Sequence, residues 1–151
     1  MTTQDRRDAV AVLLLRLSLC WFIFLWASHK LITPTQYQSL AKNFDGLDLS
    51  VTQIYLIGAI QIAICALAAL GIFRGASYGA IAAMHLYTLT RRWEGFLDPF
   101  ALNARGFPIH RNQVVDLVVM AACLALLLLI ARDHLSVGAV LNRKYGARWW
   151  R

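Results

Sequence analysis

The amino-acid sequence predicts an all-α membrane protein, a four-helix antiparallel transmembrane bundle followed by an amphipathic segment at the membrane surface. Three observations lead to this fold class. Apolar residues make up 59% of the 151 residues and the mean hydropathy is +0.55, which is unlike an ordinary soluble domain. Four long apolar runs are separated by polar connections. Most Lys and Arg residues stand at the ends of these runs, where membrane proteins place them.

The first apolar run predicts a helix over residues 9–32, which Thr33-Pro34 ends. It is long enough to cross a bilayer, and we expect it to stay in the mature protein as an anchor rather than to be cleaved as a signal peptide. Arg16 and His29-Lys30 lie within it, and charged groups at such depths need partners. Trp26, close to Lys30, marks the level of the membrane interface.

A polar stretch over residues 35–50 predicts a loop with one short turn at 36–43. The second helix is expected over residues 51–73. It carries no charge, and its Gln53 and Gln61 are expected to face a neighbouring helix rather than lipid.

Arg74-Gly75 predicts a tight turn into a third helix over residues 76–92, which is short and contains His85. The glycines before and after this turn follow a four-residue spacing that lets two helices approach closely. The connection over residues 94–112 is the longest, and loops of this length in a compact bundle are often functional or docking surfaces.

The fourth helix is expected over residues 114–131, which are nearly all apolar except for Asp116. We therefore divide the chain into a transmembrane domain, residues 1–133, and a basic interfacial tail, residues 134–151. The tail mixes aromatic and basic residues as segments on anionic leaflets do. The residues predicted to lie at the lipid interface are Trp26, Trp93, Arg143, Lys144, Trp149 and Trp150.

The distribution of basic residues predicts the orientation. With four spans, eight of the 15 Lys and Arg residues lie on the side of the two termini and six on the other side. The tail dominates this bias, so we expect both termini in the cytoplasm of a bacterial inner membrane. Lipid headgroups account for the net charge of +7, and we expect no nucleic-acid partner.

An antiparallel bundle brings several polar side chains to the opposite, outer leaflet. The functional interpretation is an outward-facing pocket for an anionic or quinone-like headgroup, with His85 or His29 as a proton donor or acceptor. The alternative is structural: an ion pair of Lys30 or Arg92 with Asp116, plus cations that reach the interface. Arg16, deep in the first helix, needs a partner from backbone carbonyls, a lipid phosphate or the tail. The candidate pocket residues are Arg16, His29, Lys30, Gln53, His85, Arg92 and Asp116.

The sequence holds no nucleophile triad, phosphate loop or metal-ligand motif. Cys20, Cys65 and Cys123 lie in three different apolar runs and are interpreted as small packing residues. His29 and His85 on different helices allow a bis-His haem in principle, without further support. We expect no metal and no catalytic activity of this chain on its own.

One resemblance emerges from the first helix. Residues 14–19 (LLRLSL), Trp21-Phe22, Leu25 and residues 29–31 (HKL) resemble the opening of the DoxX-like family of small four-helix membrane proteins. Cys20 and Ser28 stand where that family usually has glycines. The resemblance implies quinone-linked sulfur oxidation, membrane redox complexes or helper roles, and it carries over Arg16, Lys30 and, loosely, Asp116.

The resulting expectation is an accessory or structural subunit of a larger membrane redox or energy-transducing complex, in contact with lipids and other membrane subunits. One alternative is a quinone-interacting subunit of a DoxX-type, thiosulfate:quinone-like oxidoreductase, for which quinone would be the cofactor. Another is a small transporter or assembly factor.

Overall fold

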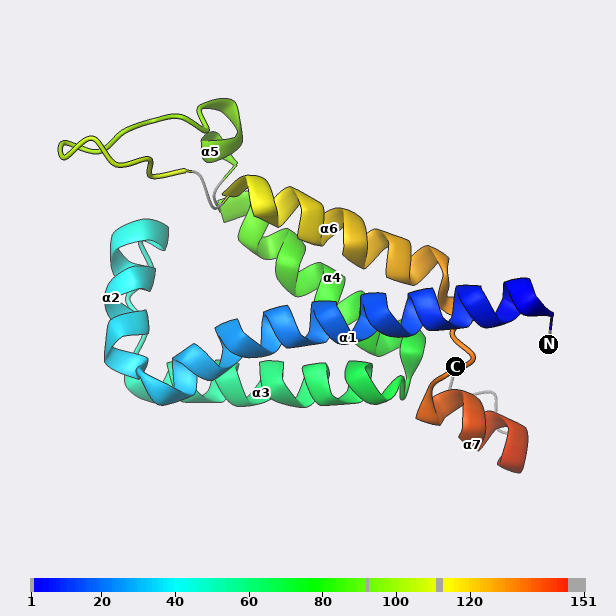
Figure 1. Cartoon of the computed structure of the whole chain (residues 1–151). Coiled ribbons are helices and arrows are strands. Elements are labelled where there is room, and N and C mark those ends of the chain that lie inside the picture. Colours follow the sequence, from blue (N-terminus) through cyan, green and yellow to red (C-terminus); the bar gives the residue numbers. More distant parts are fainter. Residues whose placement is uncertain (1, 92, 111–112, 147–151) are drawn as a thin grey trace.

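Helices make up every regular element of the chain in the computed structural model, which describes residues 2–91, 93–110 and 113–146 (Figure 1). The all-α class predicted from the sequence is confirmed. The α-helices are α1 Thr3–Ile32, α2 Pro34–Asp45, α3 Val51–Leu70, α4 Arg74–Arg91, α5 Glu94–Leu97, α6 Gln113–Leu128 and α7 Val137–Tyr145, and a 3-10 helix, η1, spans Ile130–Arg132.

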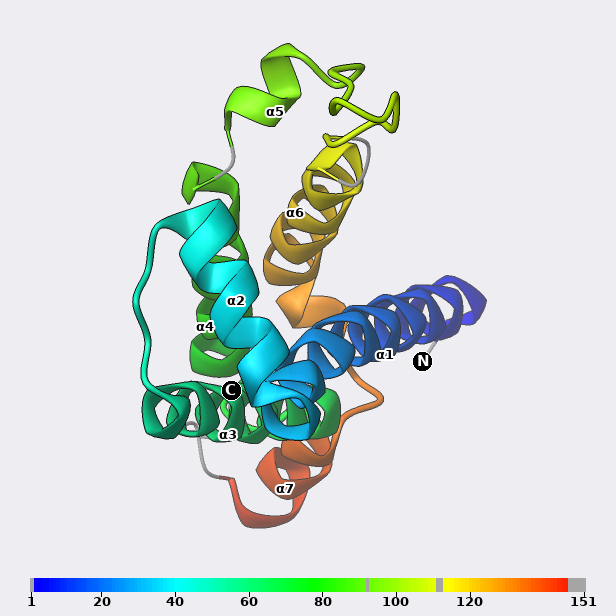
Figure 2. The same cartoon turned by 90° about the vertical axis from the view of Figure 1, so that its left-hand side faces the viewer.

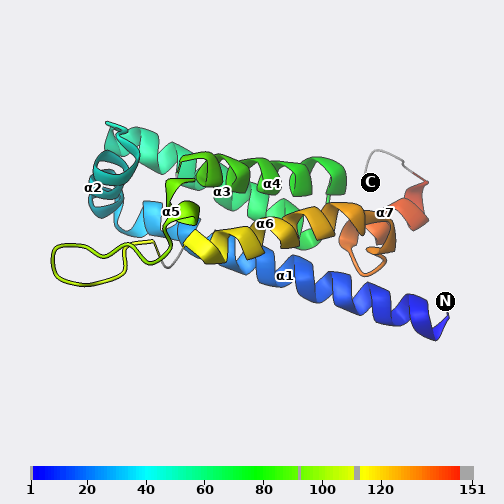
Figure 3. The same ribbon diagram turned by 90° about the horizontal axis from the view of Figure 1, so that it is seen from above.

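The four long helices form two pairs, α1 with α3 and α4 with α6 (Figure 1). Figure 3 shows that they run back and forth in succession, so that α7 and the start of α1 lie at one end of the molecule. At the opposite end α2 leaves the α1–α3 pair at a steep angle and points toward the α4–α6 side, and the long connection that follows α5 extends at this same end of the molecule (Figures 1 and 2). We call the end that holds α7 and the start of α1 the tail end, and the opposite end the α2 end.

Local caps move two boundaries away from their predicted positions. α1 begins at Thr3 rather than at residue 9, because the Thr2 and Asp5 side chains form a capping box around its first turn. The predicted loop over residues 35–50 contains the 12-residue helix α2, with Pro34 in its first turn and Gly46 in the left-handed conformation after it.

The ends of the other long helices are also set locally. α3 stops at Leu70 instead of residue 73, because Gly71 adopts a left-handed φ of 65° and closes the helix. α4 begins at Arg74, two residues before its predicted start. α6 ends at Leu128, and its predicted last turn tightens into η1.

The core lies between the helix pairs and is built from apolar side chains of α1, α3, α4 and α6. Tyr78 and Ile81 of α4 are among its most completely buried members. The three cysteines are buried and unbridged, as expected for packing residues. The core cluster consists of Val12, Leu19, Cys20, Ile23, Cys65, Ala68, Tyr78, Ile81, Ala82, Val119, Cys123 and Leu126.

Two helices, α1 and α3, are long and apolar enough to cross a membrane. The sequence predicted four such spans. The other two predicted spans do not combine the length and hydropathy of a membrane-crossing helix. α6 is apolar but only 16 residues long, whereas α4 is 18 residues long but carries arginine at both ends and His85 within it. Large apolar side chains are exposed on the outer faces of α1, α3 and α6, including Trp21, Leu56 and Val118.

Candidate functional site

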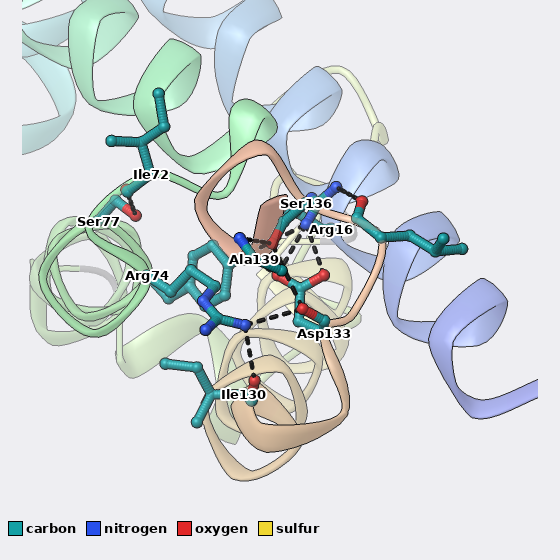
Figure 4. Close-up of polar contacts among 10 residues, drawn as sticks. Arg16, Ile72, Arg74, Ser77, Ile130, Asp133, Ser136 and Ala139 are labelled. Atoms are coloured by element: carbon teal, nitrogen blue, oxygen red, sulfur yellow. Dashed lines mark hydrogen bonds and ion pairs between the residues drawn. The ribbon is translucent and has the colours of Figure 1, made fainter. Parts of the chain in front are cut away.

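The most extensive buried polar group lies at the tail end of the molecule, around an ion pair between α1 and the segment after η1. The Arg16 Nη1 atom donates to both carboxylate oxygens of Asp133, at 2.6 and 2.7 Å. The exposed fraction is 2% for Arg16 and 0% for Asp133. Figure 4 shows the two side chains meeting where α1 passes the start of the tail.

Side chains from α4 and the tail complete this group. The Tyr78 hydroxyl donates to Asp133 Oδ2 at 2.6 Å, and Arg16 Nη2 donates to the Leu135 carbonyl at 2.8 Å. Arg74 Nη1 donates to the Asp133 carbonyl at 2.8 Å (Figure 4). We call this group the tail cluster; its members are Arg16, Arg74, Tyr78, Asp133 and Ser136.

The backbone on both sides brings these residues together. Asp133 follows directly on η1, and its N–H donates to the Ile130 carbonyl. Three residues later, Ser136 caps α7 by accepting the Ala139 N–H at 3.1 Å. Gly71 lets the tail pass close to the α3–α4 turn, since a Cβ atom there would lie 2.4 Å from the Ser136 Cβ. The turn, the tail and α1 thus converge on one point.

The geometry assigns the Arg16–Asp133 pair of the tail cluster a structural role. A buried charge is costly unless it is paired and hydrogen-bonded, and Asp133 accepts from Arg16 and Tyr78 in a setting closed to solvent. The Arg16–Asp133 contact therefore leaves no room for a substrate. It fixes the start of the tail to the first helix.

The Tyr78 hydroxyl supports a prediction about this cluster. The variant Tyr78→Phe keeps the buried ring but removes one donor to Asp133, so we expect the free energy of unfolding to fall by about 1–3 kcal/mol. Unfolding in detergent micelles, followed by circular dichroism, measures the change. Tyr87→Phe on the exposed side of α4 is the matched control, and an equal effect of both variants would contradict the role of the hydroxyl.

The residues predicted to line an outer pocket are only partly brought together. Lys30 is buried; its Nζ donates to the Trp26 carbonyl at 3.2 Å and lies 4.4 Å from the centre of the Tyr37 ring on α2. The His29 ring meets the same tyrosine edge-on, with ring centres 6.2 Å apart. His29 and Lys30, two of the candidate pocket residues, thus both contact the Tyr37 ring, which was not among the candidates.

The remaining pocket residues lie apart from this aromatic contact. Gln53 belongs to a capping box with Ser50 at the start of α3. His85 is buried, and its Nε2 lies 2.8 Å from the Asp116 carbonyl, joining α4 to α6. Lys30 and Asp116, both described, form no ion pair with each other, so of the two expected pairings only the one between Arg92 and Asp116 stays a prediction. Arg92 lies outside the described residues.

Arg16 does not belong to the outer pocket. It is 14 residues before Lys30 on α1, which places the two about 21 Å apart along the helix axis at about 1.5 Å per residue. The sequence named the tail among the possible partners of Arg16 but did not identify Asp133 or Tyr78. One signal was present: in an antiparallel bundle, the start of the first helix and the end of the fourth share one end, where Asp133 follows the last apolar run.

The predicted interface residues are found on the surface where they are described. Trp26 and Trp93 are largely exposed, and so are Arg143 and Lys144 on α7, whereas Trp149 and Trp150 lie outside the described residues. In the described part of the chain, no group of three or more His, Cys, Asp or Glu side chains is placed to hold a metal ion.

Comparisons with known proteins identify no relative of this chain. No protein-family model, no curated protein and no solved structure gives a significant match to this chain. The resemblance to the DoxX-like family in the first helix therefore gains no support from them.

Proposed function

We propose that this chain is a multi-pass protein of the bacterial inner membrane, a four-helix bundle that serves as an accessory or structural subunit of a larger membrane redox or energy-transducing complex. The observation that carries the proposal is the tail cluster: the buried ion pair of Arg16 and Asp133 is used to fix the fold. The outer faces of α1, α3 and α6 are meanwhile apolar, which suits lipid and neighbouring helices.

The lengths of the helices are compatible with four crossings. α6 and η1 follow each other with one residue between them and together reach from Gln113 to Arg132, about the 20 residues that a bilayer crossing needs. The apolar part of α4 is shorter than a bilayer crossing needs. The packing of α4 against α3 and α6 shields its polar groups from lipid. Both termini would then lie on one side, and the positive charge of the tail favours the cytoplasmic side.

Purification of the tagged chain from native membranes in mild detergent tests this proposal. We expect a stoichiometric set of membrane subunits with redox or energy-transducing centres, identified by mass spectrometry. A chain truncated after Ser136 keeps Asp133 and lacks α7, so it should stay in the membrane but recover fewer partners. A stable monomer that functions equally well without α7 would contradict the accessory role.

A second candidate function is a quinone-interacting subunit of a DoxX-type oxidoreductase. The observation that favours it is the contact of His29 and Lys30 with Tyr37, because a cationic amine, an imidazole and an aromatic ring recognise a quinone headgroup. Extraction of the purified chain should then yield quinone, and Lys30→Met should lower the bound amount. Unchanged quinone content in this variant would exclude the site.

A further inference from the structure

A hollow of about 710 Å³ lies beside the tail cluster, between the start of α1, the start of α4, η1 and α7. Its volume is in the range of small-molecule sites. The polar lining residues come from α1, α4, α7 and the segment between η1 and α7, so the hollow exists only when the tail is fixed in place. The lining residues are Asp5, Arg74, Ile130, Ala131, His134, Ala139, Asn142 and Arg143.

The lining has the chemistry of an anion site. Arg74, Arg143 and His134 supply cationic or donor groups, while Asp5 is the one carboxylate among the lining residues that the structure describes. That carboxylate already accepts the Thr2 N–H at 2.8 Å and lies 3.6 Å from Arg132. The side chains that line the hollow therefore keep a net positive charge. Arginine pairs are the usual partners of phosphate oxygens.

Arg74 is held in place before any ligand binds. Its Nη1 atom donates to the Asp133 carbonyl at 2.8 Å and approaches the Ile130 carbonyl at 3.4 Å, and only 8% of the residue is exposed (Figure 4). A guanidinium fixed in the wall loses little conformational entropy on binding. Arg143, by contrast, is exposed on α7 and can close over a ligand.

We propose that this hollow binds the phosphate group of an anionic phospholipid at the membrane surface. The inference rests on the proposed membrane location. Phosphate is also available as a free ion, but Ile130, Ala131 and Ala139 form an apolar part of the lining that a free ion would not use. The glycerol and upper acyl chain of a lipid would cover it, and the exposed Leu128 and Leu129 directly precede Ile130 in the chain.

Two neighbouring residues on α7 provide a matched test. Arg143 lines the hollow, whereas Lys144 is exposed but does not line it, so Arg143→Gln and Lys144→Gln each remove one charge from the same helix. The full chain in neutral detergent would be titrated with phosphatidylglycerol and followed by native mass spectrometry. We expect Arg143→Gln to weaken binding about tenfold, and Lys144→Gln less than about twofold because salt screens a more distant charge.

Three further measurements complete the test. Asp5→Asn removes the carboxylate from the lining and should tighten lipid binding, whereas weaker binding would contradict the proposed charge balance. Inorganic phosphate alone should compete poorly; competition as effective as that of the lipid would make the ligand a free anion. Extraction of membranes with alkaline carbonate tests the membrane location separately. An integral chain in which Arg143→Gln and Lys144→Gln weaken binding equally would overturn the lipid site but leave the membrane proposal standing.

Discussion

Replacing Asp133 by asparagine is expected to lower the free energy of unfolding by about 3–5 kcal/mol, the usual cost of leaving one partner of a buried ion pair uncompensated. Asparagine keeps the size of the side chain and still accepts a hydrogen bond. The loss therefore reports the unpaired charge of Arg16, which is 2% exposed and has no other carboxylate near it among the described residues. Denaturant titration in detergent micelles, followed by circular dichroism, measures the change.

The surface pair between Arg132 and Asp8 offers the control for this prediction. The two groups lie 3.2 Å apart but are partly exposed, so Asp8→Asn should cost less than about 1 kcal/mol. The double variant Arg16→Met with Asp133→Leu removes both buried charges and should be more stable than Asp133→Asn alone. A loss of less than about 1 kcal/mol in Asp133→Asn would show that the pair does not hold the tail.

The helical fold was largely predictable because the long apolar runs decide it. The helix boundaries were less predictable, because they depend on hydrogen bonds of a few capping side chains. The Thr2–Asp5 capping box, for example, added two turns to α1. α2 was missed as a full helix because its composition is polar, and only Pro34 and Gly46 signalled its ends. The sequence distinguishes poorly between a polar loop and a polar helix that gains stability from packing on its neighbours.

The site was harder to predict because pairing in space does not follow proximity in sequence. Arg16 and Asp133 are 117 positions apart, and their contact depends on how far the tail folds back after η1. Asp116 attracted attention because it lies inside an apolar run, but it is its backbone carbonyl that meets His85. A charge at the edge of a run, such as Asp133, can be more deeply buried than one inside it.

From the sequence, Arg16 is a candidate pocket residue that needs a partner, since intramembrane charges are expensive, and a structural role is the alternative. The structure provides that partner in Asp133 and in the Leu135 carbonyl of the tail. Arg16 joins α1 to the start of the tail, and the Asp133 carbonyl beside this contact holds Arg74 on the wall of the hollow. The ion pair and the proposed phosphate site are therefore coupled, because loss of the pair would release the Asp133 carbonyl that holds Arg74 in the wall of the hollow.

The second large effect is expected at Gly71, which ends α3 beside the tail cluster. Its φ of 65° costs any residue with a Cβ about 1–2 kcal/mol. A Cβ atom would also lie 2.4 Å from the Ser136 Cβ and 2.8 Å from Arg16 Nη1, so the tail must shift, at a further cost of about 1–3 kcal/mol. We expect Gly71→Ala to be destabilised by the sum of both effects, measured by the same denaturant titration.

Gly46 separates the two contributions. It also ends a helix with a φ of 65°, but nothing lies within 4 Å of the position of its Cβ, so Gly46→Ala should show the conformational cost alone. Adding Ser136→Gly to Gly71→Ala should restore part of the lost stability, because it removes the atom in closest contact while glycine still serves as a helix cap. If Gly71→Ala and Gly46→Ala cost the same, the tail does not pack against the α3–α4 turn, and the hollow beside it would lose the wall on which Arg74 is held.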